Sequence, residues 1–176
     1  MKKILATLLL SSCLLLTGCS TTENEKTKEL EEIQQNIEDA NISITYHDDF
    51  IVLDLSEAEV NGAALDQALY IGLSEDLQSV EWMAQDYRSD GIHYSGMYYP
   101  DDDMTLASVT IDDTPVCSMF NINTQKSYDD SSECYSESVD FINFMNGVLE
   151  DTMDTYNLSY DKLEKWAPWA FENNSK

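Results

Sequence analysis

"IHYSGMYYPDDDMTLASVTIDDTPVCSMFNI", residues 92–122, contains apolar-rich runs separated by short acidic connectors. The runs are 92–99, 104–111 and 116–122, and they are rich in the β-branched and aromatic residues that strands favour. The connectors, PDDD and DDTP, consist of residues typical of tight turns. Connectors this short join antiparallel neighbours, so the stretch predicts a three-stranded meander.

A second pair of strands is indicated upstream, in "ISITYHDDFIVLDL" at 42–55. Ile42, Ile44 and Tyr46 alternate with polar residues, and a new apolar run begins at Phe50. The two aspartates between the runs favour a turn, which predicts a hairpin. With the meander this gives about five strands.

Helical spacing of apolar residues is found on both sides of the strands. It predicts helices over 28–40, 62–73, 142–156 and 160–166. Pro168 is expected to end the last of these helices, and Ser74 can cap a continuation of the second one through Met83. The order of elements is typical of an α+β fold. We expect an antiparallel sheet of about five strands with helices packed mainly on one face.

The first residues have the pattern of a secretory leader. Lys2 and Lys3 precede an apolar run from Ile4 to Leu16, which is too short for a permanent membrane span of about 20 residues. The segment Leu16-Thr17-Gly18-Cys19 resembles the lipobox of bacterial prolipoproteins. The resemblance implies cleavage between Gly18 and Cys19, and a diacylglyceryl group with palmitate-type chains on Cys19.

The expected organisation follows from that resemblance and from composition. Residues 1–18 would be a lipoprotein signal peptide, and 19–28 a lipidated N-terminus with a flexible tether that lacks apolar side chains. Residues 29–171 would form a single acidic domain, and 172–176 a disordered tail. Two acyl chains suffice for stable anchoring, so the location implied is the extracytoplasmic face of a bacterial membrane.

The charge of the chain excludes some partners. It has 34 acidic and nine basic residues, a net charge of −25, and its leader contributes two lysines and no acid. Nucleic-acid binding needs lysine and arginine to neutralise phosphates, and is excluded. The body would also be repelled by anionic headgroups, so the membrane is contacted only through the lipid on Cys19.

Cys117 and Cys134 remain in the expected domain. Outside the cytoplasm such a pair is typical of a disulfide, which would contribute about 3 kcal/mol on the chain-entropy model. The alternative is two reduced thiols, one buried on a strand and one in a loop.

No catalytic, cofactor or metal motif is recognised. His47 and His93 are the histidines, and His93 shares a strand face with Ser95, about 7 Å away and beyond hydrogen-bond reach. The acidic stretch from Asp101 lacks the glycine that a calcium loop needs, since Leu106 occupies that position. Solvated turns, or weak divalent-cation binding by their carboxylates, remain the alternatives.

Trp82, Tyr94, Tyr98 and Tyr99 form a candidate binding platform. Strand alternation places Tyr94 and Tyr98 on one sheet face and Tyr99 on the other, so one set belongs to the core and the other can face a ligand. Ordinary core packing is the alternative for all of them.

Taken together, these patterns favour a lipid-anchored envelope lipoprotein that binds an envelope protein or glycan without catalysis. The alternatives are a carbohydrate-active hydrolase using paired carboxylates and an aromatic platform, and a folded spacer without a ligand.

Overall fold

The structure is a computed structural model that describes residues 18–60, 63–64, 67–128 and 134–174. Over these residues the chain forms an antiparallel sheet with three α-helices, which confirms the α+β class. The sheet has eight strands, so the expectation of about five was wrong. Residues 1–17, which are the expected leader 1–18 without Gly18, lie outside the described residues.

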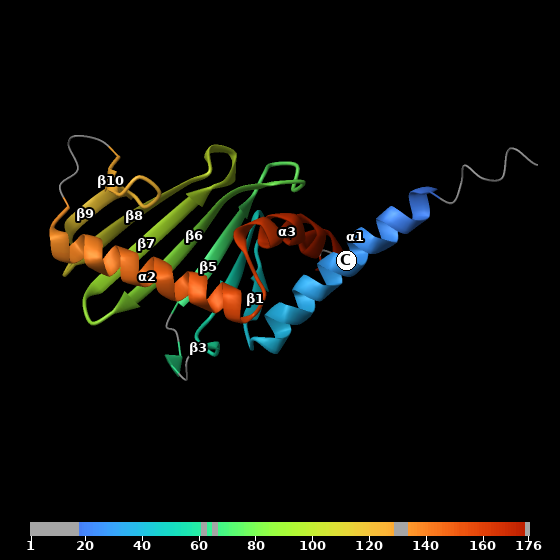
Figure 1. The fold of residues 1–176 in the computed structure, drawn as a ribbon, viewed down its shortest axis with the longest axis horizontal. Helices are drawn as coiled ribbons and strands as arrows, with labels where there is room; N and C mark the ends of the chain where they lie inside the picture. The colour runs from blue at the N-terminus through green and yellow to red at the C-terminus, as the bar shows by residue number, and fades with distance from the viewer. Residues whose placement is uncertain (1–17, 61–62, 65–66, 129–133, 175–176) are drawn as a thin grey trace, which may run out of the picture.

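The sheet is one long meander in which each strand pairs with the next one of the sheet along the chain (Figure 1). Its order is β1-β2-β5-β6-β7-β8-β9-β10, and all neighbours are antiparallel. A two-stranded hairpin of β3 and β4 is inserted between β2 and β5. The strands are β1 Ser43–Tyr46, β2 Phe50–Asp54, β3 Glu59–Val60, β4 Ala63–Ala64, β5 Gln67–Leu73, β6 Val80–Ser89, β7 Ile92–Tyr99, β8 Met104–Ile111, β9 Thr114–Asn121 and β10 Lys126–Ser127.

The predicted meander and the predicted hairpin are both confirmed. Strands β7, β8 and β9 pair in sequence, with the short 3-10 turn η1, Pro100–Asp102, between the first two. Strands β1 and β2 pair around the turn at 47–49. In both places the turn residues and the alternation of apolar side chains agree, and this agreement fixes the register.

The helix predicted over 62–73 and its continuation to Met83 are wrong, because β5 and β6 occupy these positions. Leu69 and Ile71 are buried on one face of β5, while Tyr70 lies half-buried on the other. A strand with apolar residues on both faces has no clean alternation, and its spacing also fits a helix. The missed strands account for most of the difference in strand count.

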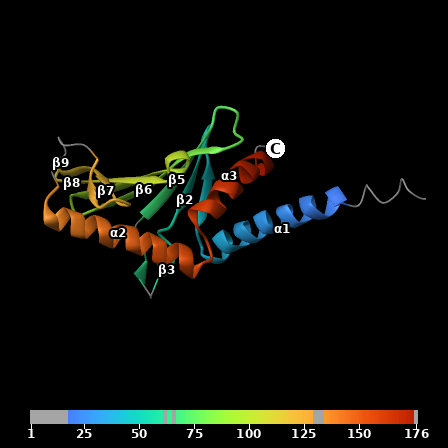
Figure 2. The ribbon, with the colours of Figure 1, turned by 45° about the horizontal axis from the view of Figure 1, so that its top comes forward.

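The helices are α1 Gly18–Asp39, α2 Ser136–Thr155 and α3 Tyr160–Asn174. Helix α2 runs across one face of the sheet, and α3 lies between the sheet and α1 (Figures 1 and 2). Ile33 and Ile37 of α1 are buried in the same core as Trp166 of α3, whose indole N–H donates to Gln34 Oε1 over 3.0 Å. The three helices and the sheet therefore share a continuous hydrophobic packing.

The helices at both ends are longer than predicted. Helix α1 begins at Gly18, so the residues expected as a flexible tether are helical; Glu and Lys are good helix formers, and no proline interrupts them. Helix α3 passes through Pro168, because Ala167 and Ala170 on either side are fully buried. The expected disordered tail is helical to Asn174, and residues 175–176 lie outside the described part.

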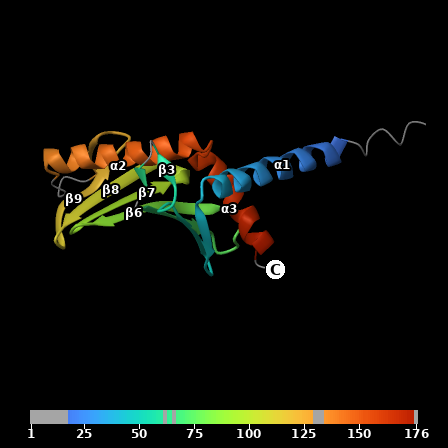
Figure 3. The same cartoon turned by 90° about the horizontal axis from the view of Figure 1, so that it is seen from below.

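The two faces of the sheet have different surroundings. We call the face under α2 and α3 the covered face; it contributes Ile51, Ile71 and Met83 to the larger buried hydrophobic cluster and Val109 to a second one. We call the opposite one the open face, because no helix of the described residues lies on it (Figure 3).

Candidate functional site

The centre of the open face is a row of apolar side chains that crosses five strands. The register places Val52 opposite Tyr70, Tyr70 opposite Ala84, Ala84 opposite Met97, and Met97 opposite Leu106. Residues paired in this way project from the same face of a sheet. All five are half-buried, although no helix covers them.

A second row lies beside the first, nearer to the turns. Phe50 is opposite Gly72, Gly72 is opposite Trp82, and Tyr99 is opposite Met104. The Trp82 indole lies directly over Gly72, where any Cβ would overlap it. Glycine at this position therefore leaves room for the indole to lie flat on the sheet.

Aromatic contacts continue along this part of the open face. The rings of His47 and Phe50 are stacked with centroids 4.2 Å apart, and those of Phe50 and Tyr70 are 6.4 Å apart. The Tyr99 hydroxyl donates to the sulfur of Met97 over 2.7 Å. We call the two rows together the apolar half of the open face: Phe50, Val52, Tyr70, Trp82, Ala84, Met97, Tyr99, Met104 and Leu106.

The residues of the predicted platform are divided between the two faces, as the alternation indicated. Tyr94 is completely buried on the covered face, and Tyr98 stacks on Tyr160 of α3 with centroids 4.6 Å apart. Trp82 and Tyr99 lie on the open face. Sequence reasoning missed their neighbours Phe50 and Tyr70, because the row is visible only once β5 and β6 are paired as strands.

The turns at one end of the sheet are acidic. The β1–β2, β5–β6 and β7–β8 connections all lie at the end of the sheet nearest Phe50, Trp82 and Tyr99. We call residues 47–49, 74–79 and 100–103 the acidic turns; they contain no lysine or arginine, and their exposed carboxylates are Asp48, Asp49, Glu75, Asp76, Asp101, Asp102 and Asp103.

Asp76 is held in its charged form. The Ser74 hydroxyl donates to Asp76 Oδ1 over 2.8 Å and the Gln78 backbone N–H donates over 3.2 Å, and these bonds lower the pKa of the carboxyl. Hydrogen bonds to the ionised form favour ionisation. The negative charge of this turn therefore persists below the ordinary pKa of an aspartate.

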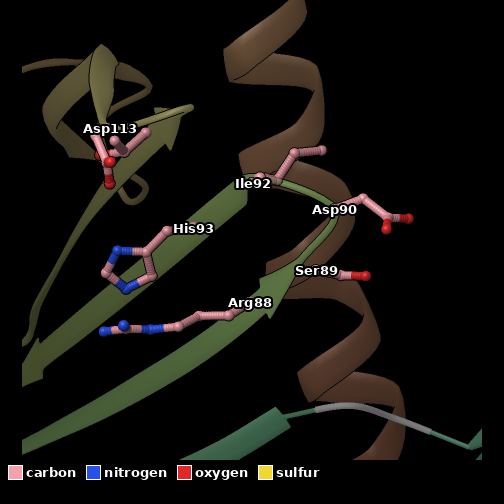
Figure 4. A pocket seen from close by; sticks show the side chains of 8 residues that line it. Arg88, Ser89, Asp90, Ile92, His93 and Asp113 are labelled. Carbon is pink, nitrogen blue, oxygen red and sulfur yellow. The ribbon is translucent and has the colours of Figure 1, made fainter.

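The other half of the open face is polar and holds a cluster of Asp86, Arg88 and His93. Asp86 Oδ1 lies 2.5 Å from His93 Nε2, and Arg88 Nε donates to Asp86 Oδ2 over 3.1 Å. Arg88 and His93 point to the same side of the β6–β7 hairpin, beside a shallow pocket of about 350 Å³ (Figure 4). Thr110 and Asp113 also line this pocket.

This cluster brings an acid and an imidazole together without a nucleophile in contact. In the part of the chain that the structure describes, no hydrogen bond joins His93 to Ser95. Within the same residues, no three histidine, cysteine or acidic side chains gather closely enough to hold a metal ion. What the geometry shows at this end of the face is an ion pair within β6, Arg88 with Asp86, and a contact between Asp86 and the His93 ring of the neighbouring strand β7.

Cys117 and Cys134 form a disulfide, so this prediction is confirmed. The bond joins buried Cys117 of β9 to Cys134, which lies just before α2. Gly18 and Cys19, the predicted cleavage and lipidation positions, are the first residues of α1. No helix among the described residues is long and apolar enough to cross a membrane.

Comparisons with protein-family models, with curated proteins and with solved structures found no match to this chain.

Proposed function

We propose that the chain is a lipid-anchored lipoprotein of the bacterial cell envelope, and that its domain is a non-enzymatic binding module. The anchor is the lipobox cysteine, Cys19. The binding surface is the apolar half of the open face, and this uncovered face is the observation that carries the proposal.

The composition of the open face supports a binding role. An antiparallel sheet with one solvated face normally alternates apolar side chains toward the core with polar ones toward water. Here Phe50, Tyr70, Trp82 and Tyr99 occupy the side that would face water. Contiguous apolar patches of this kind are typical of interaction sites, and aromatic residues are enriched in them.

The position of α1 is compatible with an anchor at Cys19. The N-terminal end of this helix projects away from the sheet (Figure 1), and its residues from Glu23 to Glu29 are exposed. Lipid chains at that end would hold the membrane at a distance from the apolar half of the open face. A partner could then reach the face without displacing the anchor.

The anchor is tested by mass spectrometry of the native product isolated from its own cells. We expect a peptide that begins at Cys19 and carries acyl chains. The Cys19→Ser variant should lose the acyl mass and leave the membrane fraction. A bare thiol, or a leader still attached to Cys19, would contradict the anchor.

The binding surface is tested by placing a photo-crosslinking amino acid at Met97 in living cells, with Phe144 as the control position. Phe144 is 63% exposed on α2 and lies away from the open face. We expect one discrete adduct from position 97 that is lost when Trp82→Ala is added, and none of that mass from position 144. Equal labelling from both positions, or none from 97, would refute binding through the open face.

A further inference from the structure

The dimensions of the apolar half limit what can cover it. Five strands about 4.8 Å apart and two rows of side chains about 7 Å apart give an area of roughly 24 by 14 Å. That is about 340 Å², well below the roughly 800 Å² that each partner contributes to a stable protein–protein interface. The patch suits a short segment instead; about seven residues in extended conformation cover 24 Å.

The surroundings of the apolar half favour a positively charged partner. Asp48, Glu75 and Asp102 represent the three acidic turns that border its end row, and all are exposed. Cations are attracted both to such carboxylates and to the faces of tryptophan and tyrosine rings, and the patch offers Trp82 and Tyr99 within one row.

The charge of the whole chain removes two other occupants. A second copy carries the same net charge of −25, so self-association is opposed by repulsion between the two chains. Anionic polymers and anionic headgroups are opposed for the same reason. A cationic partner is instead drawn toward the protein from a distance.

We propose that the open face binds a basic polypeptide segment whose apolar side chains lie on the apolar half and whose lysine or arginine side chains reach the acidic turns. This inference rests on the proposed function, since it names the chemistry of the partner at the same surface.

The test uses synthetic peptides of about ten residues, a length that spans the patch with a margin. One alternates lysine with leucine, one alternates glutamate with leucine, and one alternates lysine with serine. Binding to the full chain, kept in non-ionic detergent micelles, is measured by titration calorimetry. We expect only the lysine–leucine peptide to bind appreciably, because it alone offers both the apolar and the cationic contacts.

Two variants locate the binding, each with a matched control. Trp82→Ala should lower the affinity for the lysine–leucine peptide by about tenfold or more, as expected for an aromatic residue at the centre of an interface. Phe144→Ala on α2 should leave this affinity unchanged. The triple variant D48N/E75Q/D102N should weaken it several-fold. The control D140N/D151N/D154N removes the same charge from exposed positions of α2 and should have little effect. Circular dichroism verifies that every variant is folded.

Three results would overturn the inference: no binding of the lysine–leucine peptide, equal binding of the glutamate–leucine peptide, or unchanged binding by both Trp82→Ala and the triple turn variant. If the lysine–leucine peptide does not bind but the specific adduct from position 97 is still found in cells, the inference of a cationic partner is wrong and the proposed function stands. If the adduct is also absent, the proposed function fails with it.

Discussion

Tyr94 shows how a single side chain is constrained in this core. It is fully buried on β7, and its hydroxyl lies next to Gly96, where an added Cβ would come within 2.7 Å of the oxygen. Among the described residues this hydroxyl has no hydrogen-bond partner. Burial of an unpaired polar group costs free energy that the unfolded chain, bonded to water, does not incur.

We predict that Tyr94→Phe raises the free energy of unfolding by about 1 kcal/mol, because it removes the unpaired hydroxyl and keeps the ring. Urea titration at neutral pH measures the change. The ring also packs edge-on against Phe141 with centroids 6.3 Å apart, a contact that phenylalanine preserves. A decrease in stability would show that the hydroxyl has a partner in solution.

The raised pKa of buried tyrosines predicts how the free energy of unfolding changes at alkaline pH. Burial raises the pKa of Tyr94, and burial together with Glu150 raises that of Tyr160, above the ordinary value near 10. The unfolded chain therefore loses these protons first, and stability falls as pH rises through and above 10. The loss should begin near pH 10 and approach about 1.4 kcal/mol per pH unit for each of these two tyrosines at higher pH.

Urea titrations between about pH 8 and pH 11 measure this slope, which starts near the ordinary tyrosine pKa. Tyr94→Phe should reduce the alkaline slope, because it removes one of the two most deeply buried tyrosines whose pKa is raised. Tyr128→Phe is the control, since Tyr128 is 54% exposed. An unchanged slope in Tyr94→Phe would show that this hydroxyl ionises as readily in the folded protein as in the unfolded one.

Among the elements, the start of α2 depends on the disulfide. Cys134 lies two positions before the first residue of the helix, and its partner Cys117 is buried in β9. We predict that the Cys117→Ala/Cys134→Ala variant loses about 3 kcal/mol of unfolding free energy, the value for a loop of this length. Thermal unfolding of the wild type with and without reductant checks the result independently. No effect of either change would mean that packing alone positions α2.

Helix α1 belongs to the folded body through its second half. Ile37 is completely buried against the core, whereas Glu31 on the same helix is exposed. We predict that Ile37→Ala lowers the free energy of unfolding by 2–5 kcal/mol, a typical range for a buried aliphatic side chain, and that Glu31→Ala changes it by less than about 0.5 kcal/mol. Equal small effects would show that α1 detaches from the domain.

The elements differ in how well the sequence predicts them, and the reason is physical. Strands β7 to β9 were predicted closely because turn chemistry and alternation agree along 92–122. Strands β5 and β6 were missed because Tyr70 and Trp82 put apolar side chains on the outward face, which erases the alternation. The property that hides these strands is therefore the one that makes the open face apolar.

The candidate site was predictable only in part for the same reason. Trp82 and Tyr99 were singled out as aromatic residues, but their relation to Phe50 follows from pairing through Gly72, which composition does not reveal. Alternation alone did not show which sheet face Tyr94 and Tyr98 occupy; their burial in the structure places them on the covered face. The disulfide, in contrast, followed from cysteine number and the expected compartment.

At the scale of the whole molecule, charge opposes folding. A net charge of −25 on 176 residues creates self-repulsion that is stronger in the compact state than in the expanded one. In the described residues few cations offset it: the ion pairs of lysine and arginine are Arg88 with Asp86, and Lys165 with Glu29 at 3.8 Å. Screening by salt should therefore stabilise the native state.

We predict that the melting temperature rises when sodium chloride is increased from about 0.05 M to about 0.5 M, a range over which the screening length falls severalfold. Differential scanning calorimetry of the full chain in non-ionic micelles measures it. Calcium and magnesium chloride, compared at equal ionic strength, should raise the melting temperature equally, because diffuse screening does not distinguish ions of the same charge. A larger rise with calcium would instead indicate a selective site among the carboxylates, and a fall with sodium chloride would mean that ion pairs outweigh repulsion.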